Sequence, residues 1–395
     1  MVTLQTAENA LKSVYLGVVS NQLNINANPL LSKIKQSTAD VWGKEIRKLA
    51  PFGINGGIGA GTEDGRLPSA AANNYVQFVS TLKNLYGTIE ISDKAIRASE
   101  NNAGAFVNLL NAEMEGLIKA SSFNFGRMLY GDGRGLLAKV VAHNPVNDYF
   151  EVTTVRNLME GMKIDFFDEF EGIIKGESFF INRRIKAIDR LNNRVYVEPV
   201  LTMELNTDIY LVNQGSFNLE LTGLGAIFND APTLYGVNKY ENIWLNPYKN
   251  AAIGEISDIS IQSAVDYLEE TSGSAIDFIT CSSMVKRAYQ TYLASFRRNI
   301  DVLDLAGGYK ALSFNGIPLM SDRFVEDDAM YLLNTKEFTL HQLCDWQWLE
   351  GEDGKVIRQI ANYPTYTATL VKYADLICDK PNGQAKLSGI IPPLV

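Results

Sequence analysis

The stretch that decides the fold is residues 102–130, NAGAFVNLLNAEMEGLIKASSFNFGRMLY. Its apolar residues recur at the three-and-four spacing of one helix face, and no proline interrupts them. A helix of this length extends about 40 Å, whereas a compact chain of this size has a radius of gyration of about 21 Å. We therefore predict a spine helix that crosses most of the molecule and stops at Gly131 and Gly133. The side chains expected on its core face are Phe106, Leu110, Met114, Leu117 and Phe125.

An extended hairpin is predicted on the N-terminal side of this helix. Residues 41–49 and 76–82 have strand character, and the second segment alternates apolar and polar side chains. Residues 6–22 are expected to form a short amphipathic helix ahead of them. An isolated two-stranded ribbon is marginally stable in water, so we expect a neighbouring subunit to cover the hairpin. The residues expected to mark its glycine-rich tip are Gly53, Gly56, Gly57, Gly59, Gly61, Asp64 and Arg66.

The chain after the spine helix is rich in short strands. From residue 136 to residue 213 they alternate with turns, which indicates a small β-barrel inserted into the main fold. Further helices are expected at 260–269 and 282–298, and further strands at 276–279, 309–333 and 366–378. The whole chain is therefore predicted to be α+β.

The composition is that of a globular protein, with 46% hydrophobic and 21% charged residues. A net charge of −9 argues against a surface that grips nucleic acid, because phosphate contacts need an excess of basic residues. No apolar run approaches the roughly 20 residues that span a bilayer, so no membrane segment is expected. Cys281, Cys344 and Cys378 are few and far apart, which indicates buried thiols rather than a disulfide framework.

The motifs of common active sites are missing or incomplete. Residues 57–62 break the glycine spacing of a dinucleotide site, and no phosphate-binding loop sequence occurs. His341 and Cys344 could share one face of a helix, but a metal site needs three or four ligands. The turn acids Asp327, Asp328, Glu350, Glu352 and Asp353 fit capping and solubility better than acid–base catalysis. We therefore expect no catalytic residue, no cofactor and no metal. Trp346 and Trp348 could stack on a sugar, so a carbohydrate-binding or carbohydrate-active β-rich protein remains an alternative function.

The order of these elements resembles that of tailed-bacteriophage major capsid proteins of the Hong Kong 97 fold. An N-terminal arm and a glycine-tipped loop precede the strand YGTIEIS at 86–92 and then the spine helix. The C-terminal half adds FNGIPLMSD at 314–322, MYLLN at 330–334 and YTATLV at 366–371. The resemblance covers nearly the whole chain, and it is carried by the order of elements rather than by any single motif.

The resemblance implies a division of the chain into the parts of that fold. Residues 1–40 would be the N-terminal arm, 41–85 the extended loop, 86–136 the peripheral domain with the spine helix, and 137–213 the insertion domain. The peripheral domain would continue through 214–250, 251–319 would form the axial domain, and 320–395 would return to the peripheral domain.

The resemblance also implies a structural role without enzyme activity. Subunits would assemble as pentamers and hexamers into an icosahedral virion shell around double-stranded DNA, formed in the cytoplasm of a bacterial host. A portal and a decoration protein are further possible partners. Two departures matter: residues 51–82 contain no lysine for loop cross-linking, and the short arm implies a separate scaffolding protein. An encapsulin-like nanocompartment shell is the alternative within the same fold.

Overall fold

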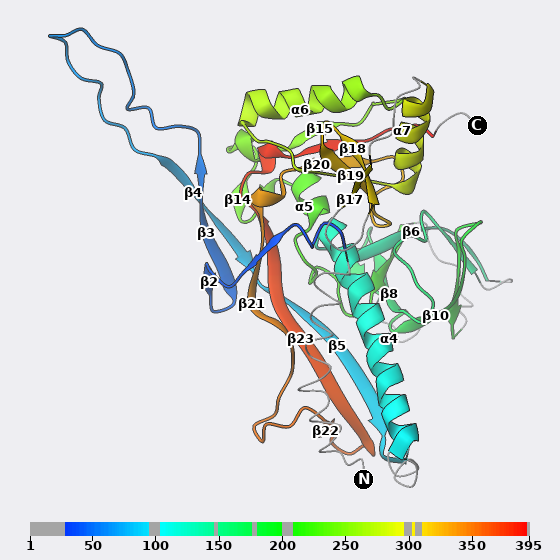
Figure 1. Ribbon diagram of the computed structural model, residues 1–395. Coiled ribbons are helices and arrows are strands. Elements are labelled where there is room, and N and C mark those ends of the chain that lie inside the picture. Colours follow the sequence, from blue (N-terminus) through cyan, green and yellow to red (C-terminus); the bar gives the residue numbers. More distant parts are fainter. Residues whose placement is uncertain are drawn as a thin grey trace.

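The computed structural model describes residues 28–94, 103–145, 149–175, 180–199, 208–295, 302–304 and 310–392. The helix expected at 6–22 lies outside the described residues, as does the end of the helix expected at 282–298. The described chain is α+β, as predicted, and Figure 1 shows a long sheet with its spine helix, a barrel, a second sheet with helices, and a projecting hairpin.

The spine helix α4 (Ala103–Tyr130) runs along a five-stranded sheet. The strands of this sheet are β1 (Lys35–Ser37), β21 (Phe338–Trp348), β23 (Thr365–Cys378) and β22 (Arg358–Gln359), with β5 (Lys83–Ser92) paired along β23. The helix comes very close to β5 at Gly87, where an added Cβ would lie 2.8 Å from Cδ1 of Leu117. A side chain at position 87 would therefore displace the Leu117 side chain at this crossing.

Three of the side chains expected on the core face of the spine helix are described. Met114 and Phe125 are buried, and Leu117 is partly buried against the same core. The side chains of Phe106 and Leu110 lie outside the described residues. The helix ends at Tyr130, where the Gly131 amide donates to the Met128 carbonyl.

The predicted insertion is a closed barrel with its own core. Six strands form a ring in the order β10-β11-β7-β6-β12-β8, which the β8–β10 pair closes, and β9 (Ile173–Ile174) extends β8. The ring strands are β6 (Leu136–Asn144), β7 (Tyr149–Val152), β8 (Lys163–Asp168), β10 (Arg183–Asp189), β11 (Arg194–Glu198) and β12 (Ile209–Asn213). Its buried residues all fall between Leu137 and Leu211. The chain enters and leaves the barrel side by side, because Leu136 pairs with Val212.

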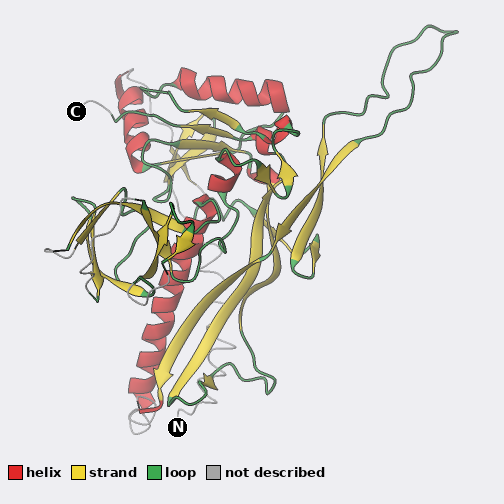
Figure 2. Cartoon of the chain, turned by 180° about the vertical axis from the view of Figure 1, so that it is seen from behind, coloured by secondary structure: helices red, strands yellow, loops and turns green. Residues whose placement is uncertain are grey.

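A second seven-stranded sheet, with its own hydrophobic core, carries helices α6 (Asp258–Ser272) and α7 (Ser283–Ser295). Figure 2 shows these helices beside the sheet, away from the long strands. The strands, in order, are β15 (Tyr248–Asn250), β24 (Ala385–Leu387), β20 (Met330–Leu333), β16 (Phe278–Cys281), β19 (Ile317–Ser321), β18 (Lys310–Phe314) and β17 (Val302–Asp304).

This sheet draws strands from distant parts of the chain. Strands β20 and β24, which come after residue 320, lie inside it. Tyr248 in β15 pairs with Ala385 in β24. Pairings between strands this far apart in sequence leave no local pattern, and the division of the chain into peripheral and axial domains stays a prediction.

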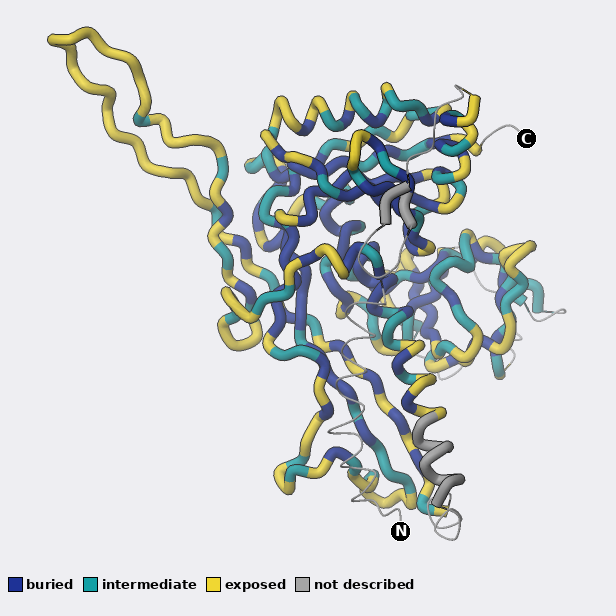
Figure 3. The backbone as a smooth tube through the Cα atoms, in the orientation of Figure 1, coloured by how far each residue is buried: buried dark blue, intermediate teal, exposed yellow. Residues whose placement is uncertain are grey.

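The hairpin consists of β3 (Glu45–Phe52) and β4 (Asn74–Thr81), with the short β2 (Val41–Trp42) beside β3. Pairing of the two long strands runs from Glu45 opposite Thr81 to Phe52 opposite Asn74. Residues 53–73 then continue outward from the molecule (Figure 1), and Figure 3 shows them almost wholly exposed.

Candidate assembly surface

The hairpin tip exposes large apolar side chains that nothing in the described chain covers. Ile54, Ile58 and Leu67 are 77%, 78% and 89% exposed. Exposed apolar groups that lie close together on a protein mark interaction sites. The tip therefore has the chemistry of a surface that another chain buries.

The predicted tip residues shape this surface. The Gly57 amide donates to Oδ1 of Asn55 at 2.8 Å, and Nδ2 of Asn55 donates to Oδ1 of Asn73 at 3.0 Å, which ties the two sides together. Gly53 has a φ of +65°, a conformation that favours glycine. Gly56, Gly59, Gly61, Asp64 and Arg66 lie exposed in the same segment. Among the described residues, no ion pair involves Asp64 or Arg66.

The root of the hairpin is anchored firmly to the body. The ring of Trp244, in the short helix η2 (Ile243–Leu245), stacks on Phe52 and on Phe78, with centroids 5.1 and 6.2 Å apart. The Val79 amide donates to the Tyr235 carbonyl at 2.9 Å. Nζ of Lys48 donates to Asp379 at 2.7 Å. The direction in which the tip projects is therefore fixed by contacts with two separate segments.

A buried carboxylate adds a further anchor beside the root. Asp375 is fully buried and accepts hydrogen bonds from Ser80 Oγ, from the Thr222 amide and from Thr222 Oγ1. Burial raises the pKa of this carboxyl above its usual value, and the hydrogen bonds oppose the shift. Asp375 thus joins β4, the segment after the barrel, and β23.

The outer face of the hairpin exposes apolar side chains among polar ones. Ile46, Ala50 and Phe78 on the inner face are buried. Residues directly opposite each other in a strand pair share a face, so the outer face carries the exposed or partly exposed side chains of Trp42, Leu49, Pro51, Tyr75 and Val79. The same face carries Glu45, Arg47, Gln77 and Thr81, and Arg47 pairs with Glu45 at 2.9 Å.

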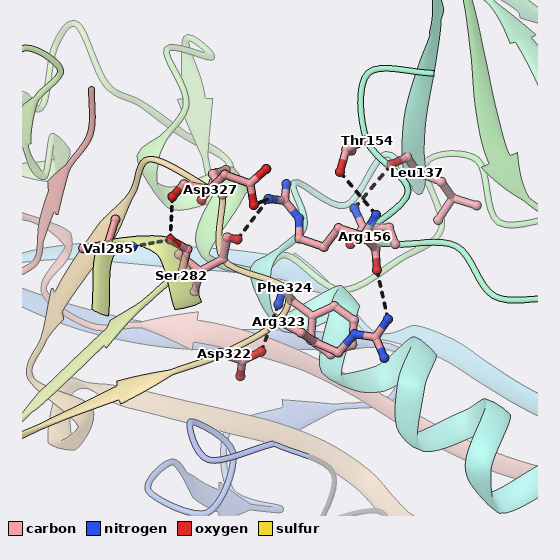
Figure 4. Close-up of polar contacts among 12 residues, drawn as sticks. Leu137, Thr154, Arg156, Ser282, Val285, Asp322, Arg323, Phe324 and Asp327 are labelled. Atoms are coloured by element: carbon pink, nitrogen blue, oxygen red, sulfur yellow. Dashed lines mark hydrogen bonds and ion pairs between the residues drawn. The ribbon is translucent and has the colours of Figure 1, made fainter. Parts of the chain in front are cut away.

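The barrel is docked on the loop between β19 and β20, as Figure 4 shows. Nη1 of Arg156 donates to the Val325 carbonyl at 2.9 Å and lies 3.6 Å from Oδ1 of Asp327. Arg323 donates to the Arg156 carbonyl at 3.3 Å, and its guanidinium lies 4.7 Å from the ring centroid of Phe123 in α4. This loop therefore links the barrel to the spine helix.

The same loop is tied to the second sheet. Ser282 Oγ donates to the Asp327 carbonyl and accepts a hydrogen bond from the Val285 amide at the start of α7. Asp322 accepts hydrogen bonds from Asn28, from the Tyr130 hydroxyl and from the Phe324 amide (Figure 4 labels Asp322 and Phe324). One short loop thus joins the N-terminal arm, the spine helix, the barrel and helix α7.

A cavity of about 480 Å³ lies between β5, α4 and residues 213–220. Leu117, Met128 and Leu219 provide apolar wall, and Asn84 and Asn124 provide carboxamides.

Two alternatives raised by the sequence are contradicted. Trp346 and Trp348 are 5% and 4% exposed, so they provide no stacking platform for a sugar. His341 and Cys344 lie on strand β21, not on a helix. Nδ1 of His341 contacts the Ala39 carbonyl at 2.9 Å, and burial lowers the pKa of its imidazole. Among the described residues, no group of three or more His, Cys, Asp or Glu side chains could hold a metal ion.

The turn acids take part in structural contacts. Asp327 lies near Arg156, Oδ2 of Asp328 accepts from the Gly389 amide at 3.0 Å, and Asp353 pairs with Lys355. The sequence did not indicate the roles of Trp244, Tyr235 or Arg156, because their partners lie far away along the chain. None of the helices in the described part of the chain has the length and apolarity that crossing a membrane requires.

Comparisons with known proteins agree with the architecture. No protein-family model matches the chain, and no curated protein sequence matches it. The capsid asymmetric unit of cyanophage A-1(L) is similar in structure, with a TM-score of 0.51 at 12% identity over 96% of this chain and 93% of that chain. The holo-SrpI encapsulin complex of Synechococcus elongatus PCC 7942 gives 0.47 at 10% identity over 92% and 89%. Mycobacterium phage Adephagia gives 0.44 at 10% identity over 93% and 91%.

The cyanophage comparison alone exceeds a TM-score of 0.5 among these three, and the fold assignment depends on it. The predicted resemblance to phage capsid proteins is confirmed at the level of the fold.

Proposed function

We propose that this chain, which has the fold of a phage capsid protein, is the major capsid protein of a tailed bacteriophage. Copies of it assemble as pentamers and hexamers into an icosahedral shell around double-stranded DNA, and the protein resides in the virion. The observation that carries the proposal is the structural match to the cyanophage capsid protein, which spans nearly the full length of both chains. The exposed hairpin supports it independently, because the large apolar side chains exposed on it, above all at the tip, need another chain to cover them.

Assembly follows from the hairpin. The tip and the outer face of the hairpin of one copy lie on the next copy, which buries Ile54, Ile58, Leu67 and Tyr75. Burial of apolar surface stabilises by about 25 cal/mol per Å², and obligate interfaces commonly exceed about 2,000 Å². The contact joins different surfaces of the two copies, and such heterologous contacts form closed rings when the rotation between copies allows it.

The anchored root gives this contact a defined angle. Phe52, Phe78 and Trp244 hold the base of the hairpin, while the glycine-rich tip adapts to the neighbouring surface. A fixed base with an adaptable tip suits a shell, because copies in pentamers and hexamers meet neighbours at different angles.

The net charge of −9 suits a wall that encloses DNA without gripping it. A separate scaffolding protein and a portal are the partners we propose, and a decoration protein could bind the outer face. The role is structural, and no residue is assigned to catalysis or to a cofactor.

The test is to express the chain alone and with a phage scaffolding protein, and to image the products by negative-stain electron microscopy. Closed shells in either case support the proposal, and DNA-filled particles from an infected host support the phage assignment. Shells that hold a protein cargo would favour the nanocompartment alternative. Well-folded chains that never form shells would contradict the proposed function.

A further inference from the structure

Lys372 is a fully buried lysine in the middle of β23, on the side of the sheet that faces α4. Its Nζ lies 5.7 Å from the ring centroids of both Phe125, in α4, and Trp346, in β21. The amine is therefore shielded from water by two aromatic rings.

A carboxylate and a carboxamide lie next to this amine. Oδ1 of Asp345 lies 2.8 Å from Nζ, and Oε1 of Gln36 lies 3.4 Å from it. Asp345 lies within an irregularity of β21, where the register with β23 shifts between Cys344 and Gln347. Such irregularities redirect side chains. An amine, a carboxamide and a carboxylate therefore converge from three strands of one sheet.

Burial changes the reactivity of the amine. Desolvation lowers the pKa of Lys372, and the nearby Asp345 carboxylate opposes the shift. A lysine in an apolar site becomes a nucleophile once it is neutral. Holding reactants next to each other replaces the encounter that the same reaction needs in solution.

We propose that Nζ of Lys372 forms an intramolecular isopeptide bond with the side-chain carbonyl carbon of Gln36, with Asp345 moving the protons. Asp345 accepts a proton from the Lys372 ammonium, and the neutral amine attacks Cδ of Gln36. A proton then passes from the attacking nitrogen to Nε2 of Gln36, the C–Nε2 bond breaks to release ammonia, and Asp345 gives its proton to that ammonia to form ammonium. The balance is one ammonium and one carboxamide converted into one secondary amide and one ammonium ion, with no oxidant or reductant.

Formation of the amide removes the unfavourable free energy of burying a charged amine. A cation held away from water is unfavourable unless its partners compensate fully, whereas a neutral amide costs far less to bury. The bond joins β1 at the root of the N-terminal arm to β23, and so secures the arm within its own subunit. It is independent of the proposed assembly, because all three residues belong to one chain.

Lys239 provides an internal comparison. It is also buried, and desolvation lowers its pKa, but the oxygens that its Nζ contacts are the backbone carbonyls of Ile227 and Asn229. Among the described residues, no side-chain carboxamide accepts a hydrogen bond from this amine, so we expect Lys239 to stay a free amine.

The test is the intact mass of the purified full-length protein under denaturing conditions, followed by peptide mapping. We expect a mass lower than that of the sequence by one ammonia, and a branched peptide that joins Gln36 to Lys372. Lys372→Arg, Gln36→Met and Asp345→Asn should each have the full mass of their sequence, whereas Lys239→Arg should keep the deficit.

The wild-type measurement needs no variant to fold, so it decides the matter alone. A wild-type protein with the full mass of its sequence would overturn the proposal. A mass lower by one water, with a peptide that links Asp345 to Lys372, would also overturn it. So would a mass lower by one ammonia if peptide mapping places the loss at Asn55–Gly56.

Discussion

The indole of Trp244 lies flat against the ring of Phe52, with the centroids 5.1 Å apart and the planes 4° from parallel. Phe52 is the last paired residue of β3 before the exposed tip, and Trp244 belongs to the body of the molecule. This stack lies where the hairpin leaves the subunit, so it determines the direction of the tip.

Replacing Trp244 by Ala should therefore loosen the hairpin more than the body. We expect a loss of about 1–3 kcal/mol in the free energy of unfolding, since the stacks on Phe52 and Phe78 disappear. Denaturant titration gives this number, and shell formation should become inefficient. The control is Ile243→Ala, at a neighbouring side chain that is 74% exposed, where the change should stay within about 0.5 kcal/mol. Equal effects of the two substitutions would show that the stack has no special role.

Removing the tip should separate folding from assembly. Phe52 and Asn74 are opposite each other, so residues 53–73 can be replaced by a two-residue Asn-Gly turn. We expect a folded monomer, because the deleted residues are almost wholly exposed, and no closed shells. Size-exclusion chromatography and electron microscopy measure the two outcomes. Normal particles from this variant would contradict the assembly role of the tip.

Shells should contain no covalent links between copies through residues 51–82, the outer part of the hairpin and its tip. Residues 51–82 include no lysine, so the nucleophile for such a link is missing. Boiled particles should therefore migrate as single chains near 43.8 kDa on a denaturing gel. A ladder of multimers would mean that another residue supplies an intermolecular bond. The bond proposed within one chain predicts no ladder, so the gel and the intact mass report on different linkages.

Excising the barrel should leave the rest of the subunit folded. Leu136 and Val212 are paired, so a short flexible linker can replace residues 137–211. The buried residues of the barrel form a separate cluster, and the Arg156 and Arg323 contacts are the polar links we expect the body to lose. We expect a modest fall in thermal stability, with shells of irregular size. An insoluble product would show that the barrel belongs to the main core.

The Glu160–Arg190 pair should make a pH-dependent contribution to the stability of the barrel. Two hydrogen bonds from the guanidinium, at 2.7 and 2.8 Å, are the main reason that the pKa of Glu160 falls from 4.5 to about 2. A lowered pKa in the folded state stabilises above the unfolded pKa, and this stability is lost as pH falls from 4.5 towards 2. Because the pair is solvent-exposed, Glu160→Gln should cost less than about 1 kcal/mol at neutral pH. The difference from wild type in urea unfolding should vanish near pH 2, and a constant difference would contradict the assignment.

The sequence predicted the features that depend on local patterns. The spine helix was predicted to within one residue of its bounds, since a 3.6-residue periodicity lies within the helix itself. The barrel segment was found because its strands alternate and its turns are short. The exposed tip was found from its glycines and its lack of a regular pattern.

Contacts between distant segments escaped prediction. Strand β24 joins the second sheet by pairing with β15 and β20, and nothing near residue 385 indicates this. The sequence around Trp244 and Arg156 does not indicate their roles, because their partners are distant along the chain. Trp244 stacks on Phe52, and Arg156 lies near Asp327. The spacing of His341 and Cys344 suggested a helix because it was considered without the strand that contains both residues.

The adjacent ends of the barrel have a consequence for how such proteins can diversify. The chain enters the barrel at Leu136 and returns to the body of the subunit at Val212, on the neighbouring strand. The two junctions are therefore only about 4.8 Å apart. Any domain with neighbouring termini fits this junction without rerouting the polypeptide. If the chain assembles into a shell as proposed, this position is a graft site at which foreign antigens or enzymes would be displayed in many copies.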